Sequence, residues 1–122
     1  MASSQRKLGL IVPSWNTVME YEVQRMAGGE MSVHSMRIPH TADTEEKLLW
    51  LGTQAPAAAE LLAHAKVNVI CYGCAAGGFL KGPVEDRALG ERIAKETGIP
   101  VAVSSAAVAE GLRALGATRV SL

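Results

Sequence analysis

The chain has no surplus of either charge, few cysteines and no long apolar run. Its 122 residues include 12 basic and 12 acidic side chains, so the formal net charge is zero. Proteins that bind the phosphate backbone of a nucleic acid usually carry a basic surplus, so this balance argues against a dedicated nucleic-acid binder. No apolar run reaches the length of a bilayer span, and residues 1–7 lack the apolar stretch of a secretory signal. We therefore expect no nucleic-acid partner and no membrane partner.

The only two cysteines, Cys71 and Cys74, stand three positions apart. A pair this close does not make the disulfide framework of a secreted domain, so free thiols in a reducing cytoplasm are the simplest interpretation. The C-x-x-C spacing leaves a redox or metal function as an alternative. Cys71 falls inside a predicted strand, however, whereas redox motifs place their first cysteine at a helix start, and no second pair supplies four zinc ligands.

The remaining composition is that of a globular protein, with 48% hydrophobic and 20% charged residues. A chain of this length fits one α/β domain, residues 1–122, with a real core. Apolar segments alternate with helical patterns, which implies right-handed crossovers and a parallel sheet with helices on both faces. We predict the strand order 2-1-3-4. The strands are expected over residues 7–12, 32–38, 67–72 and 101–103, with the start of a fifth at 119–122.

Capping signals locate the helices between these strands. Thr17-x-x-Glu20 and Asp43-x-x-Glu46 are capping boxes, each of which predicts a helix start. Pro56 is expected to start or kink a second helical segment, and Ser105 is most simply the N-cap of the last helix. Because the fifth strand begins with nothing after it, we expect that a following half is missing.

The most informative segment is the apolar strand that runs into Cys74 and is followed by Ala-Ala-Gly-Gly. A strand end fixes the position of a side chain, and small residues let a ligand approach the backbone closely. A thiolate is a strong nucleophile and a usable acid or base, so Cys74 is the candidate catalytic residue. The alternative is a cysteine that only fills the core.

Two further segments follow predicted strands and should meet Cys74 beyond the carboxyl ends of the sheet. In the first, the amide of Asn16 is suited to donate to a substrate carboxylate, and Ser14 shares that loop. A turn asparagine bonded to its own backbone is an equally good interpretation of Asn16. In the second, Ser105 and the start of its helix are suited to hold an anion. The three histidines have no mutual spacing that suggests a metal site.

Together these motifs resemble the aspartate/glutamate racemase superfamily, and most closely its branch of maleate cis-trans isomerases and arylmalonate decarboxylases. In that family two similar α/β halves face each other, and each half places a cysteine beside the substrate. The resemblance covers essentially the whole chain and implies that it corresponds to the N-terminal half. It rests on residues 9–14 with Asn16 and Thr17, on residues 72–74, and on residues 104–106, 111–116 and 119–120.

The resemblance also implies roles for individual residues. Cys74 corresponds to the catalytic cysteine of the first half, and Asn16 and Ser14 to ligands of a substrate carboxylate. The backbone amides that follow Cys74, those of Ala75 and Ala76, would belong to an oxyanion site. No organic cofactor and no metal is implied.

The expected function is therefore a cofactor-independent, cysteine-dependent isomerase of a small dicarboxylic acid. A racemase or a decarboxylase on the same scaffold is the first alternative, although decarboxylases of this group carry a hydroxyl residue where Cys74 stands. A non-catalytic flavodoxin-like binding domain is the second. The chain is expected to form a homo-oligomer or to associate with the missing half, and the half alone is expected to be inactive.

Overall fold

The computed structural model describes residues 5–121, whose four strands form one parallel sheet in the order β2-β1-β3-β4. The central strand β1 (Arg6–Pro13) pairs with β2 (Met31–Ile38) on one side and with β3 (Val69–Tyr72) on the other. The edge strand β4 (Val101–Val103) pairs with β3. The predicted parallel sheet and its strand order are confirmed.

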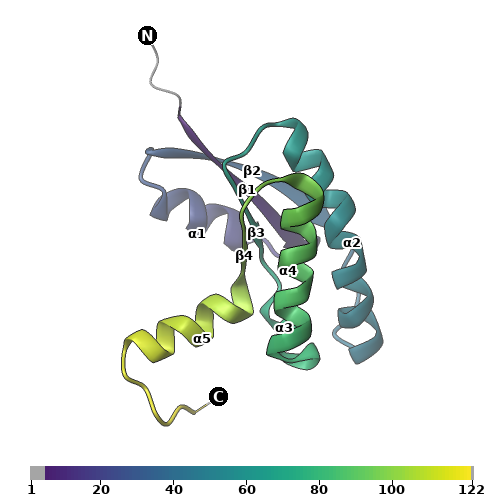
Figure 1. Ribbon diagram of the computed structural model, residues 1–122, viewed down its shortest axis with the longest axis vertical. Helices are drawn as coiled ribbons and strands as arrows, with labels where there is room; N and C mark the ends of the chain where they lie inside the picture. The colour runs from purple at the N-terminus through teal and green to yellow at the C-terminus, as the bar shows by residue number, and fades with distance from the viewer. Residues whose placement is uncertain (1–4, 122) are drawn as a thin grey trace.

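Helices cover the sheet unequally on its two faces (Figure 1). The long helices α2 (Glu45–His64) and α4 (Pro83–Thr97) lie along one face, and α1 (Met19–Met26) lies on the other. The short helix α3 (Ala75–Lys81) follows β3, and α5 (Ser104–Ala114) extends away from the end of β4. Because α1 buries none of its residues and α5 buries only one, the core lies mainly under α2 and α4.

The core forms where the apolar strands meet the small and aliphatic side chains of α2. Burial of one Leu, Ile or Val side chain contributes about 1.5–3 kcal/mol, so this layer supplies most of the hydrophobic stabilisation. At the centre are the largest of the side chains with at most 2% of their surface exposed, namely Leu10, Ile11, Val12, Leu51, Ile70, Tyr72 and Ile93.

Two predicted helix caps are each wrong by one residue. The first helix begins at Met19, and its free N–H groups are bonded by Asn16 Oδ1 and not by Thr17. In α2 the N-cap is Thr44, whose Oγ1 accepts a hydrogen bond from the backbone N–H of Lys47, and not the predicted Asp43. In both places several residues with capping side chains are adjacent, and the turn before the helix decides which one caps.

Pro56 does not start a second helix, as one of the two predicted alternatives had it. It lies inside α2, which runs unbroken for 20 residues. Proline in a helix interior costs about 3 kcal/mol because it removes a hydrogen bond and crowds the preceding turn. Here the helix is buried on both sides of the proline, through Leu51, Ala55 and Ala59, and this packing outweighs the local cost.

The segment after β3 is a helix, which the sequence does not predict. Glycine disfavours helices, so the Ala-Ala-Gly-Gly sequence conceals α3, which is held by its packing against α2, α4 and α5. Conversely, residues 119–121 form no strand because they follow α5 away from the sheet (Figure 1), and Leu122 lies outside the described residues. Among residues 5–121, no helix is both long and apolar enough to cross a membrane.

Candidate active site

The loop that follows β1 is fixed at the carboxyl edge of the sheet by contacts from the end of β2. The Ser14 hydroxyl accepts from the backbone N–H of His40 at 2.9 Å and donates to its carbonyl at 3.3 Å. The guanidinium of Arg37 donates to the carbonyls of Ser14 and Asn16, the latter at 2.7 Å, and pairs with Glu20 at 2.9 Å. These contacts hold the loop in one conformation.

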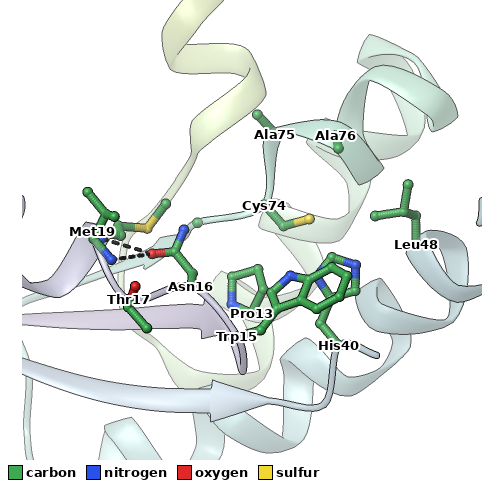
Figure 2. Close-up of a pocket in the computed structure, with 12 residues that line it drawn as sticks. Pro13, Trp15, Asn16, Thr17, Met19, His40, Leu48, Cys74, Ala75 and Ala76 are labelled. Atoms are coloured by element: carbon green, nitrogen blue, oxygen red, sulfur yellow. Dashed lines mark hydrogen bonds between the residues drawn. The ribbon is translucent and has the colours of Figure 1, made fainter. Parts of the chain in front are cut away.

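The oxygen and the nitrogen of the Asn16 side-chain amide face different surroundings. Its side-chain oxygen accepts from the backbone N–H groups of Val18 at 3.0 Å and Met19 at 2.9 Å, which caps α1. Figure 2 shows this oxygen turned to the helix start, with the amide nitrogen on the side of Cys74. The structure therefore places Asn16 as a local cap and leaves its two N–H donors at the cavity that it shares with Cys74.

Cys74 stands where β3 ends and α3 begins. Its side chain is 5% exposed, it occupies the N-cap position of α3, and it is a free thiol. The preceding Gly73 continues the sheet by donating its N–H to the carbonyl of Ile11 at 2.8 Å. A methyl group on Gly73 would collide with Met19 Sδ and meet that same carbonyl at 3.0 Å, so a larger residue would force the loop and the strand apart.

The loop and the cysteine border one cavity of about 640 Å³ (Figure 2). Within the described part of the chain its lining includes no Lys, Arg, Asp or Glu side chain, so polar recognition falls to amide, hydroxyl, imidazole and thiol groups. The lining residues come from the ends of β1, β2 and β3 and from the starts of α1, α2 and α3: Pro13, Trp15, Asn16, Thr17, Val18, Met19, His40, Leu48, Gly73, Cys74, Ala75 and Ala76.

The sequence reasoning missed His40, which lines this cavity after the end of β2. The side chain is buried, its ring lies 4.4 Å from the indole of Trp15, and Nε2 lies 3.2 Å from Asp43 Oδ1. Its Nδ1 has no hydrogen-bond partner within residues 5–121. Its position in the sequence could have indicated this, because His40 follows the end of a strand that pairs with β1 and so lies at the same edge of the sheet as Asn16 and Cys74.

Two of the predicted site residues lie outside the cavity. Ser14 supports the loop from behind through its bonds to His40. Ser105 is the second residue of α5 and not its N-cap, which is Val103. Its buried hydroxyl donates a short hydrogen bond to the buried carboxylate of Asp86 in α4, so it serves helix packing. By contrast Asn16, Cys74 and the two alanines after it do share one cavity.

The second cysteine is placed differently. Cys71 lies within β3, is half-buried and does not line the cavity. Burial raises the pKa of its thiol, which makes it a weak nucleophile at neutral pH. Within the described residues there is no group of three or more His, Cys, Asp or Glu side chains that could hold a metal ion.

The fold and this site define an α/β protein with a cysteine and an asparagine at one cavity on the carboxyl edge of its sheet. The sequence profile of the arylmalonate decarboxylase family matches residues 8–122, and the chain belongs to this family. It is 35% identical to the maleate isomerase of Nocardia farcinica over 126 residues, which covers 96% of this chain and 50% of that protein. With the maleate isomerase of Geobacillus stearothermophilus the identity is 30%, over 95% of this chain and 51% of that one.

Solved structures show the same relationship. A variant of the maleate isomerase Iso from Pseudomonas putida S16, solved with maleate, superimposes with a TM-score of 0.85 at 28% identity, over 91% of this chain and 49% of that chain. A variant of the Nocardia farcinica maleate cis-trans isomerase with a covalently bound succinylcysteine intermediate gives 0.79 at 33% identity, again over 91% and 49%. The chain thus spans about half the length of the curated relatives it matches.

Proposed function

We propose that this chain provides one half of the active site of a cofactor-independent, cysteine-dependent cis-trans isomerase that acts on a small dicarboxylic acid such as maleate. The carrying observation is that Cys74 and the free amide of Asn16 border the same cavity. The relatives named maleate isomerase support the substrate class, and the succinylcysteine in one of them supports a covalent role for a cysteine.

In the proposed reaction the Cys74 thiolate adds to one alkene carbon of the cis-dicarboxylate. A carbon–sulfur bond forms, and the alkene electron pair moves into the carboxylate on the neighbouring carbon, which becomes an enediolate. The former double bond is now single and rotates. The electron pair then returns, the carbon–sulfur bond breaks, and the trans-dicarboxylate leaves with the thiolate regenerated.

The developing enediolate carries extra negative charge, and the cavity offers neutral donors for it. The amide of Asn16 is one, and the first backbone N–H groups of α3, those of Ala75 and Ala76, have no partners within their own helix. Removal of one preorganised donor of this kind typically costs about 3–4 kcal/mol of transition-state stabilisation. The absence of acidic side chains from the described lining favours binding of a dianion.

The complete site, in this proposal, also needs a second half. The chain covers only about half of its maleate isomerase relatives, and α5 presents apolar side chains to solvent. Val108 is 48% exposed and Leu115, at the end of the helix, is 84% exposed. We expect α5 to pack against that second half or, when it is absent, against another copy of this chain. Cytoplasmic location remains a prediction.

Binding of maleate to the isotope-labelled chain, followed by amide NMR, tests the proposal. The amide signals of Asn16 and of residues 73–76 should shift and saturate. Cys74→Ala should keep binding, because the thiol reacts and does not hold the carboxylates. Asn16→Asp should abolish binding, because it keeps the oxygen that caps α1 but turns the amide donor into a negative carboxylate.

Cys71→Ala is the matched control, since Cys71 lies outside the cavity, and it should bind like the parent chain. The melting temperature of Asn16→Asp should stay near that of the parent, which separates loss of binding from loss of folding. If maleate shifts no cavity amide, or if Asn16→Asp binds as tightly as the parent, the assigned site is wrong. Saturable binding without turnover by a chain that includes the second half would instead favour the non-catalytic binding domain.

A further inference from the structure

We propose that Tyr72 is a positioning residue for Cys74, whose hydroxyl donates a hydrogen bond to the cysteine sulfur and stabilises the reactive thiolate. This inference rests on the proposed function in one respect, that Cys74 reacts as a thiolate. It assigns a role to a side chain that lines no part of the substrate cavity.

The two side chains lie next to each other on one face of the sheet. Tyr72 is the last residue of β3 and Cys74 follows two positions later, and alternate residues of an extended segment point the same way. Both are buried, with 2% and 5% of their surfaces exposed. A methyl group placed on Gly77 would lie 3.6 Å from Cys74 Sγ and 3.9 Å from the Tyr72 hydroxyl oxygen. The sulfur and the hydroxyl oxygen therefore both lie beside Gly77 of α3.

Two glycines make room for the hydroxyl between the helices above the sheet. Gly77 in α3 is one, and Gly52 in α2 is the other, where an added methyl group would stand 3.7 Å from the same oxygen. That methyl group would also lie 3.1 Å from Nζ of Lys81, so a positive charge approaches the phenol from the last turn of α3. The hydroxyl is therefore bounded by the cysteine, two helix backbones and an ammonium group.

The electrostatics of the phenol agree with a donor role. Burial raises the pKa of Tyr72 above its ordinary value, and the neighbouring Cys74, by its charge and by a side-chain hydrogen bond, raises it further, as does Asp86. The phenol therefore keeps its proton across the physiological range, and a protonated phenol can donate to a thiolate. Two other charged side chains lie near the pair, Lys81 of α3 and Asp86 of α4, and their charges are of opposite sign.

Two further titratable groups face this region. Cys71 occupies the same strand as Tyr72, and His40 lines the cavity on the other side of Cys74. Neither changes when the hydroxyl of Tyr72 alone is removed. Tyr72→Phe is therefore the diagnostic substitution, because it deletes one oxygen from a buried ring and leaves the surrounding charges in place.

The test measures the rate of alkylation of Cys74 by iodoacetamide as a function of pH, in a Cys71→Ala background so that a single thiol reports. We expect Tyr72→Phe to move the midpoint of the profile upward by about one pH unit, which reduces the thiolate fraction about tenfold well below the midpoint. The rate there should fall about threefold and the plateau at high pH should not fall, because a thiolate of higher pKa is intrinsically more nucleophilic. Tyr21→Phe, in an exposed tyrosine of α1, is the matched control and should move neither.

A midpoint that does not move, or a change confined to the plateau, would overturn the proposal, because a purely structural role alters access at every pH. If Tyr72→Phe does not fold, fluorotyrosine in the Tyr21→Phe background gives the complementary measurement. Fluorine makes the phenol a stronger donor, so the midpoint should then move downward, and no shift would contradict the proposal. Because no dicarboxylate is used, failure here is distinguishable from failure of maleate binding.

Discussion

The close approach of α3 to its neighbours at Gly78 gives a quantitative prediction for the helix that begins at Cys74. A methyl group on Gly78 would lie 2.6 Å from Asp86 Oδ1 and would also collide with the hydroxyl of Ser105. These two side chains are buried and bonded to each other, so neither can move away into solvent. Gly78→Ala should therefore displace α3 or break the Asp86–Ser105 bond.

The expected loss of stability follows from two unfavourable effects and one favourable effect. Overpacking of a filled core costs about 1–3 kcal/mol. Loss of a hydrogen bond to a carboxylate costs about 1.5–3 kcal/mol. Alanine is a better helix former than glycine by about 1 kcal/mol, which offsets part of this loss. We expect the free energy of unfolding to fall by about 1.5–5 kcal/mol, or about 6–20 °C in Tm for a chain of this size.

Urea unfolding followed by circular dichroism measures this difference. Gly111→Ala is the matched control, because Gly111 lies in α5 with no atom within 4 Å of its added methyl group. It should raise the free energy of unfolding by about 0.5–1 kcal/mol. If Gly78→Ala is as stable as the parent, or is stabilised like Gly111→Ala, the packing of α3 described above is wrong.

Two further predictions concern pH and helix capping. Burial raises the pKa of Cys71 above its ordinary 9.0 and raises that of Tyr72 as well, so the unfolded chain loses these protons first. The two protonated groups therefore contribute fully to the free energy of unfolding at neutral pH, and this contribution should decline above about pH 9. Urea unfolding at several pH values measures the decline, and Cys71→Ala should make it less steep. Thr44→Ala removes the cap bond to Lys47 and should cost about 1 kcal/mol in thermal unfolding, whereas Thr53→Ala inside the same helix should not; equal effects would contradict the cap.

Much of the fold was predictable because the decisive signals are local. The apolar runs that became β1 and β3 are short and lack helical periodicity, and the alternation of strands with helices fixes a parallel sheet. The meeting of Asn16 and Cys74 follows from the same topology, since both come just after strands that pair in the sheet. The sequence therefore predicted correctly that these two residues share one cavity.

The features that sequence reasoning missed depend on contacts between distant residues. Ser105 carries the signature of a helix cap, and only its bond to Asp86, 19 residues away, shows that it packs helices together. The contacts of Arg37 with the loop carbonyls cross 21 and 23 positions and leave no local pattern. α3 was missed because its glycines, which disfavour a helix locally, are needed where it packs closely against α4 and α5.

The most direct test of the central claim is peptide mass mapping of the chain after incubation with maleate. The account predicts a saturable succinyl adduct on Cys74, which forms when the enediolate takes a proton from water instead of expelling the thiolate. It predicts none on Cys71 and none in Cys74→Ala. Asn16→Asp should form it far more slowly than the parent, because the dicarboxylate is no longer held at the cavity. An adduct that forms equally on both cysteines, or one that forms as fast in Asn16→Asp as in the parent, would contradict the assignment of Cys74 as the nucleophile of this cavity.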